Sequence, residues 1–199
     1  MRIFSNYPHL FVTTFLLLLL SCNSSQTENK EQPVLIDSLE IENTSDTLGK
    51  SYFDFDEVDH FHSDTGHVFF REDSLLTSKE LLFKKIFEGD FPDAISDTSF
   101  VSELTDLGFI KEDVDTSKNK GINFLFREKD FAPYEVAACI PEYRDILIFR
   151  KSKKIIGIAK VCFTCSALFA TGTDAITSNF GSYDGFGKLG NLLYDANEN

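Results

Sequence analysis

Two apolar segments, residues 145–150 and 155–163, most strongly limit what this chain can fold into, because only the polar residues 151–154 separate them. Both segments alternate weakly and are apolar on both faces, which is typical of strands in the middle of a sheet. The short Lys-Ser-Lys-Lys link joins the two strands. We therefore expect a sheet with other parts of the chain packed against each of its faces.

Two helices are expected to provide that cover. Thr77 and Glu80 form a capping-box pattern, and Gly89 is placed to end the helix that follows. The apolar stripe of this helix consists of Leu81, Leu82, Phe83, Ile86 and Phe87. A second helix is expected over residues 98–107, where apolar residues fall on one face and Gly108 can close the helix.

The remaining patterns are shorter. Strands are expected within 52–71, on either side of a turn at 63–66, and also over 122–127 and 134–139. A polar loop is expected over 112–121, and a final helix over about 186–194. Because strands and helices are grouped and do not alternate regularly, the sequence predicts an α+β fold with a single domain and a largely antiparallel sheet covered by a few helices.

The N-terminus carries an apolar segment, residues 10–20, shortly after Arg2. This segment is too short to span a bilayer, since a helical span needs about 20 residues, but it has the length of the apolar region of a secretory signal. Residues 23–32 contain no hydrophobic side chain, so nothing there offsets the entropy of ordering, and a flexible tether is expected. A plain signal peptide or a short anchor is one interpretation.

Residues 19–22, Leu-Leu-Ser-Cys, resemble a bacterial lipobox, although Leu20 is larger than the residue usual at its position. The resemblance implies that residues 1–21 are removed and that Cys22 carries a diacylglyceryl group, usually with a third acyl chain. At about 0.8 kcal/mol per buried CH₂, two or three such chains hold a protein on a membrane. Asn23 stands where Asp retains many lipoproteins at the inner membrane, which favours the outer membrane.

The chain is acidic, with a formal net charge of −13 that becomes more negative when Arg2 is removed with the signal segment. Nucleic-acid binding depends on clustered Lys and Arg at phosphates, so this charge argues against a nucleic-acid partner. It also disfavours attraction to anionic lipid. We therefore expect the lipid on Cys22 to attach the protein to the membrane.

Cys139, Cys162 and Cys165 follow the signal sequence, so we expect them outside the cytoplasm, where disulfides persist. Three thiols cannot all pair within one chain, and one interpretation is a structural disulfide plus one buried free cysteine. Residues i and i+3 of a straight strand point to opposite faces. Cys162 and Cys165 can therefore act together only if the strand ends or turns at 163–164, and otherwise one of them pairs with Cys139.

Two chemical alternatives remain for these cysteines. The Cys162-x-x-Cys165 spacing is that of a redox pair, although no βαβ unit precedes it as in thioredoxin domains. Three thiolates with one His or carboxylate would also satisfy tetrahedral zinc, although the second C-x-x-C of a zinc ribbon is absent from the sequence. Both alternatives stay open beside the disulfide interpretation.

Cys139-x-Pro141, the strand pair over 144–161 and the Cys-Phe-Thr-Cys run at 162–165 together resemble the C-terminal part of a group of bacterial lipoproteins. In that group a C-x-P motif, an aliphatic and aromatic strand pair and a C-F-x-C motif recur. The likeness covers roughly residues 135–194. It implies that the three cysteines belong to one structural unit, and it implies no substrate.

His60, His62 and His67 lie among acidic residues. Two histidines at i and i+2 of a strand share a face, and a third across a turn could complete a metal site. The alternative is a solvated acidic hairpin that holds no metal.

The sequence thus predicts a lipoprotein signal peptide over 1–21, a lipidated cysteine and flexible acidic tether over 22–50, and an α+β domain over 51–199. The domain contains a cysteine-bearing β-hairpin at 139–165. A composition with 42% hydrophobic residues and 21 Phe is ample for the core of one domain.

No catalytic or ligand-binding signature in the sequence is complete, and no cofactor is indicated. The leading hypothesis is a lipid-anchored envelope protein that acts as a non-catalytic binding or envelope-maintenance module, with the membrane as its first partner. The alternative hypothesis is a thiol redox or zinc protein that uses Cys139, Cys162 and Cys165.

Overall fold

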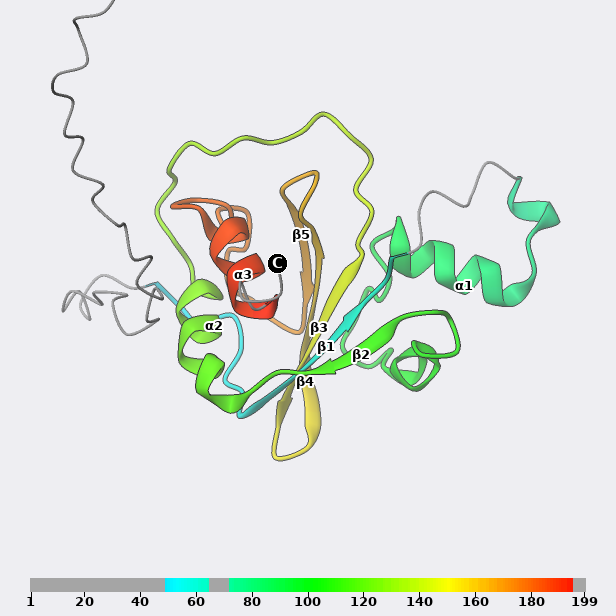
Figure 1. Ribbon diagram of the computed structural model, residues 1–199, viewed down its shortest axis with the longest axis horizontal. Coiled ribbons are helices and arrows are strands. Elements are labelled where there is room, and N and C mark those ends of the chain that lie inside the picture. Colours follow the sequence, from blue (N-terminus) through cyan, green and yellow to red (C-terminus); the bar gives the residue numbers. More distant parts are fainter. Residues whose placement is uncertain (1–48, 65–71, 195–199) are drawn as a thin grey trace, which may run out of the picture. The chain divides into compact units, whose positions relative to one another are not determined.

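The structure, a computed structural model, describes residues 49–64 and 72–194 (Figure 1). The predicted signal peptide over 1–21, the lipidation site Cys22 and nearly all of the tether lie outside these residues, as does His67.

A five-stranded antiparallel sheet in the order β2-β1-β3-β4-β5 forms the centre of the fold. Its strands are β1 (Glu57–His62), β2 (Ile110–Asp113), β3 (Asp145–Lys151), β4 (Lys154–Cys162) and β5 (Ala167–Thr171). The helices are α1 (Ser78–Phe87), α2 (Asn119–Leu125) and α3 (Gly185–Leu193), and short 3-10 helices occupy Asp73–Leu75, Ser99–Glu103 and Thr116–Lys118. The α+β class with an antiparallel, helix-covered sheet is confirmed.

The hairpin of β3 and β4 is the central pair of the sheet, as its apolar pattern predicts. Ser152 and Lys153 form its turn with φ angles of 49° and 68°, the left-handed backbone that a two-residue hairpin turn requires. Leu147 pairs with Ala159, and Ile148 pairs with Ile158. Because successive side chains alternate between faces, each strand contributes to two separate cores.

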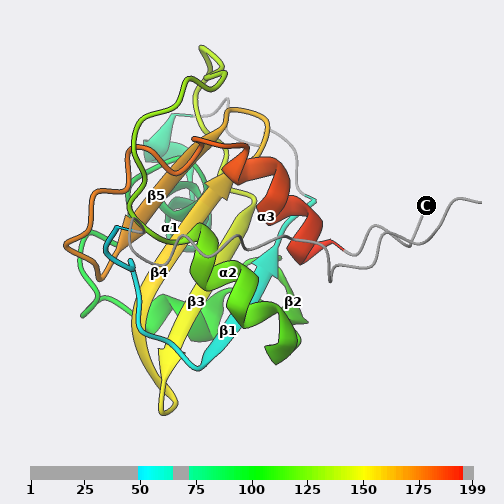
Figure 2. The same ribbon diagram turned by 90° about the vertical axis from the view of Figure 1, so that its left-hand side faces the viewer.

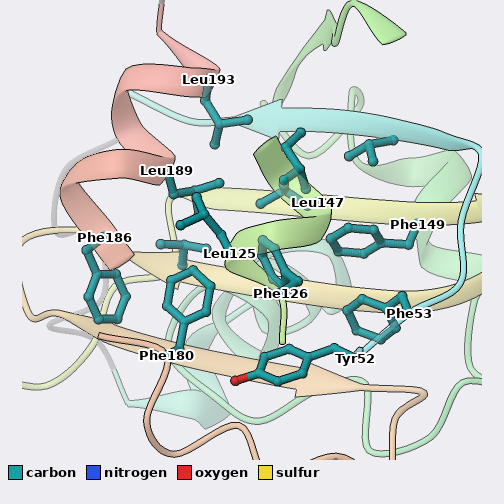
Figure 3. Packing of buried hydrophobic residues seen from close by; sticks show 14 residues of the cluster. Tyr52, Phe53, Leu125, Phe126, Leu147, Phe149, Phe180, Phe186, Leu189 and Leu193 are labelled. Carbon is teal, nitrogen blue, oxygen red and sulfur yellow. The ribbon is translucent and has the colours of Figure 1, made fainter. Parts of the chain in front are cut away.

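One face of the sheet is covered by α2 and α3, which lie in front of the strands in Figure 2. Leu147 and Phe149 of β3 pack there against the apolar sides of both helices. Figure 3 shows Phe180 between Phe126 and Phe186, with ring centroids 4.9 and 5.1 Å away. These aromatic contacts join α2, α3 and the sheet into one core.

The opposite face is covered by α1 and by the segment that contains the 3-10 helix Ser99–Glu103. The capping box of Thr77 and Glu80 is present, as predicted, and Glu88 is the C-terminal cap just before Gly89. The buried residues of α1, Phe83, Ile86 and Phe87, pack in one cluster with Ile146, Ile148 and Ile158 of the sheet.

Gly157 on β4 is required by close packing. A Cβ atom at this position would overlap the ring of Phe53. The Phe53 ring stacks on Phe149 with a centroid separation of 4.4 Å. The absence of a side chain at Gly157 therefore lets the first described segment of the chain lie flat on the sheet.

Several sequence predictions about elements are wrong. Residues 98–107 form a 3-10 helix and turns rather than an α-helix, although Gly108 does adopt the left-handed conformation, with φ of 100°. The expected loop over 112–121 contains the end of β2 and the start of α2, and the expected strand over 122–127 lies mostly in α2. The expected strand over 134–139 is irregular, and β5 was not expected.

Two other expectations concern the first strands and the final helix of the domain. The first strand expected within 52–71 is present as β1, whereas the second falls partly on residues 65–71, outside the described part of the chain. The final helix is confirmed as α3. Within residues 49–64 and 72–194, no helix has both the length and the apolar character to cross a bilayer.

Candidate functional site

The three cysteines of the domain come together at the end of the central hairpin. Cys139 and Cys165 form a disulfide with a Cα–Cα distance of 6.1 Å, and Cys162 is free and buried. This confirms the interpretation of one disulfide with one buried free cysteine. The strand ends at Cys162 and turns over residues 163–166, so the turn at 163–164 is present, and Cys165 nevertheless pairs with Cys139.

Cys162 is enclosed by protein. It packs in one buried cluster with Tyr143 and Cys165, against which Ala167 and Phe169 of β5 also pack. Its Sγ atom lies 3.3 Å from the hydroxyl oxygen of Thr164. The two halves of the disulfide differ in exposure, because Cys165 is buried while Cys139 is exposed.

Lys160 lies two residues before Cys162 and is completely buried on the same face of β4. Its Nζ atom donates hydrogen bonds to the carbonyl oxygens of Ile86, at 2.9 Å, and of Gly89. The rings of Tyr143 and Phe169 lie 4.5 and 4.8 Å from the same nitrogen. A buried amine, a buried thiol and a disulfide thus share one side of the sheet.

The environment changes the acid–base properties of this cluster. Burial lowers the pKa of Lys160 to about 7, and the charges of Asp90 and Asp93 offset only part of that effect. Burial also raises the pKa of Tyr143, and the charges of Asp90 and Cys162 act in the same direction. Lys160 is therefore a group that changes charge near neutral pH within a buried cluster.

Sequence reasoning did not identify Lys160 or Tyr143 as members of the cluster. The only local signal for Lys160 is a lysine inside the apolar run of residues 155–163. Tyr143 carries no comparable signal, because only the fold places it against Cys162.

The histidines lie on the opposite face of the sheet, beside the end of α3. His60 is buried, and its Nε2 atom forms a hydrogen bond of 2.8 Å with Oδ1 of buried Asp145. The hydroxyl of Tyr194 donates a hydrogen bond to the same carboxylate oxygen. The expectation of a solvated hairpin is wrong for His60, because α3 and the residue after it cover this part of β1.

Glu112 of β2 links the two histidines. Its Oε1 atom lies 3.2 Å from Nε2 of His62, and its Oε2 atom lies 3.7 Å from Nδ1 of His60. Among the residues that the structure describes, no three His, Cys, Asp or Glu side chains are placed to hold one metal ion. The third predicted ligand, His67, lies outside them.

Tyr194 and Asp145 form the buried centre of this polar cluster. Burial raises the pKa of Tyr194, and its hydrogen bond to Asp145 raises it further. The phenol therefore stays protonated and remains a hydrogen-bond donor to the carboxylate at physiological pH. The arrangement ties the end of α3 to the first residue of β3.

A second ionic cluster surrounds Asp59, which lies on the face of β1 opposite to His60. Burial alone would raise the pKa of Asp59, but hydrogen bonds from Lys111 and Arg150 outweigh burial and lower it. Both nitrogens lie 2.7 Å from the carboxylate oxygens. This cluster joins β2, β1 and β3, so it stabilises the sheet and leaves no carboxylate oxygen of Asp59 without a cation.

Comparisons with known proteins do not assign a role to any of these three clusters: no protein-family model, no curated protein and no solved structure matches this chain.

Proposed function

We propose that the protein is exported, that it is anchored to the cell envelope through a lipid on Cys22, and that its folded domain is a non-catalytic binding module. The Leu-Leu-Ser-Cys pattern at residues 19–22 supports the anchor. The disulfide between Cys139 and Cys165 supports export, because such bonds persist outside the cytoplasm.

The observation that carries the binding role is the 126–144 connection between α2 and β3, which arches over one end of the sheet (Figure 1). Its residues are all described, and none of them lies in a helix or a named strand. Loops longer than about 15 residues without secondary structure are uncommon in compact domains and are usually either functional loops or linker segments. The 126–144 connection is therefore the element best suited to present a binding surface.

The 126–144 connection is held at several points. Ala132 N donates to Ser182 Oγ at 3.0 Å, and the same hydroxyl donates to Ala132 O at 3.1 Å. The Tyr134 hydroxyl donates to Ser178 O at 3.1 Å. Further along, the disulfide fixes Cys139 to the end of the hairpin. A segment fixed in this way loses less conformational entropy when a partner binds it.

The 126–144 connection carries exposed apolar side chains. Phe131, Val136 and Ile140 are 70%, 65% and 78% exposed. Two acidic residues of the same segment, Asp130 and Glu135, are exposed as well. The partner that fits this surface is an envelope protein with an apolar patch bordered by basic residues, because such a partner would match both features.

Site-specific photocrosslinking in intact cells tests this role. A photoreactive residue placed at Phe131 or Ile140 is expected to give one discrete crosslinked protein, and an apolar patch bordered by basic residues at the crosslinked site of that protein would support the contact. The matched control is Leu75, which is also apolar and is 65% exposed but lies in another part of the domain. Equal crosslinking from all three positions, or none from Phe131 and Ile140, would overturn the proposal.

The thiol alternative is favoured over zinc by one observation. In this structure Cys139 and Cys165 are bonded to each other, so a zinc site with three thiolates would first require reduction of the disulfide. A thiol function that uses the free Cys162 thiol does not require reduction of the disulfide first.

A further inference from the structure

We propose that Cys162 exchanges with the Cys139–Cys165 disulfide, so that this cluster is a thiol–disulfide exchange site that converts a buried thiol into a solvent-exposed one. The inference goes beyond the binding role, because it concerns covalent chemistry and does not depend on any partner of the 126–144 connection.

The geometry places the reacting sulfurs in one region. Cys162 is the last residue of β4, and Cys165, which follows it in the turn over residues 163–166, belongs to the same buried cluster. Cys162 is therefore placed to attack Cys165, the buried half of the disulfide. The leaving sulfur is that of Cys139, which lies on the exposed 126–144 connection.

The exchange balances within the chain. The Cys162 thiolate attacks Sγ of Cys165, a Cys162–Cys165 bond forms, and the Cys139–Cys165 bond breaks. The electron pair of the broken bond leaves on Sγ of Cys139, which takes up a proton in place of the one that Cys162 lost. One S–H and one S–S bond exist before and after the step, so neither an oxidant nor a reductant is needed.

To Lys160, the buried amine on this side of the sheet, we assign the role of assisting the loss of the thiol proton. It lies on the same strand face as Cys162, and both residues pack against Tyr143. Because burial lowers the pKa of Lys160 to about 7, a neutral amine is present at neutral pH and can accept a proton. A positively charged Lys160 would in turn favour the thiolate.

The product differs from the starting state in what it presents to solvent. Cys162 is only 1% exposed, whereas Cys139 is exposed on the 126–144 connection. Exchange therefore places a reactive thiol at the surface, where it can form a mixed disulfide with a cysteine of another protein. It also removes the covalent tie between the connection and the hairpin.

Alkylation of the native full chain tests the exchange. The oxidised protein is incubated with N-ethylmaleimide under non-denaturing conditions, quenched in acid at intervals, digested without reduction and mapped by mass spectrometry. The expected result is maleimide on Cys139 that accumulates with time, together with a Cys162–Cys165 disulfide in the same molecules. Maleimide on Cys162 with the Cys139–Cys165 bond intact, or no labelling before denaturation, would overturn the proposal.

Two variants sharpen the result. Cys162→Ser removes the attacking thiol and is expected to abolish labelling of Cys139, whereas persistent labelling would contradict the exchange.

Lys160→Met is expected to slow labelling of Cys139 at neutral pH at least tenfold, and an unchanged rate would overturn the part assigned to Lys160. If either variant fails to fold, the time course of the wild-type chain still decides the main proposal.

Discussion

Nζ of Lys160 lies 2.9 Å from the carbonyl oxygen of Ile86, so a lysine of β4 donates a hydrogen bond to the last turn of α1. The last four carbonyls of a helix have no partner within the helix. Lys160 satisfies the carbonyl of Ile86, and a basic group at this end interacts favourably with the helix dipole. The contact explains how a completely buried lysine is tolerated between Tyr143 and Phe169.

Lys160→Met should change how stability depends on pH. The folded-state pKa of Lys160 is lowered to about 7 from its ordinary value of 10.5, so between these two pH values the unfolded chain binds more protons. The free energy of unfolding of the wild-type protein therefore rises with pH in this window, by up to about 1.4 kcal/mol per pH unit from this group. Below pH 7 the contribution of Lys160 to the free energy of unfolding no longer changes with pH, because the lysine is protonated in both states.

Urea denaturation at several pH values between 7 and 10 checks this expectation. The rise should be smaller in Lys160→Met, and the matched control Lys154→Met, at an exposed position of the same strand, should keep the wild-type slope. Identical slopes for the wild type and Lys160→Met would show that the lysine is not titrating in this window.

Gly157→Ala should destabilise the domain. The added methyl group would overlap the Phe53 ring, which stacks on Phe149 in a dense aromatic core. Overpacking of this kind costs about 1–3 kcal/mol, measurable as a lower urea midpoint. Gly190→Ala is the control, because its Cβ would meet Phe163 only at an ordinary 3.7 Å and alanine favours a helix by about 1 kcal/mol. Equal effects of the two substitutions would contradict the packing argument.

Tyr194→Phe should loosen the end of α3. The substitution removes the hydrogen bond to Asp145 and leaves that buried carboxylate with His60 as its remaining partner in the cluster. We expect a loss of about 1–3 kcal/mol in the free energy of unfolding, since a hydrogen bond to a charged group is removed. Tyr183→Phe, at an exposed position before α3, should have little effect. Unchanged stability of Tyr194→Phe would mean that the contact contributes nothing.

Cys22→Ala should release the protein from membranes or leave it unprocessed, because the acyl chains that would hold it cannot be attached. Fractionation of cells and measurement of the mature mass check this expectation. Asn23→Asp is the control, since it keeps the cysteine and should stay membrane-bound while shifting toward the inner membrane. Membrane association that persists in Cys22→Ala would overturn the lipoprotein proposal.

Elements with strong local patterns were predicted correctly. The capping box of Thr77 and Glu80 begins α1, and the apolar strands at 145–150 and 155–163 form the central hairpin. Both depend on neighbouring residues or on the spacing of apolar side chains, which are properties of a short stretch of chain. The segment 122–127 has an apolar run too short to distinguish a strand from a helix, and packing decides in favour of α2.

Local periodicity was enough to predict the α+β class and the central hairpin, and the three cysteines after residue 50 were enough to predict that one of them stays unpaired within the domain. The pairing of Cys139 with Cys165, the burial of Lys160 on the same strand face as Cys162, and the position of His60 under the end of α3 became apparent only from the folded chain. Each of these outcomes depends on which distant segment covers a given side chain. Such contacts are set by long-range packing, and no spacing along the chain encodes them.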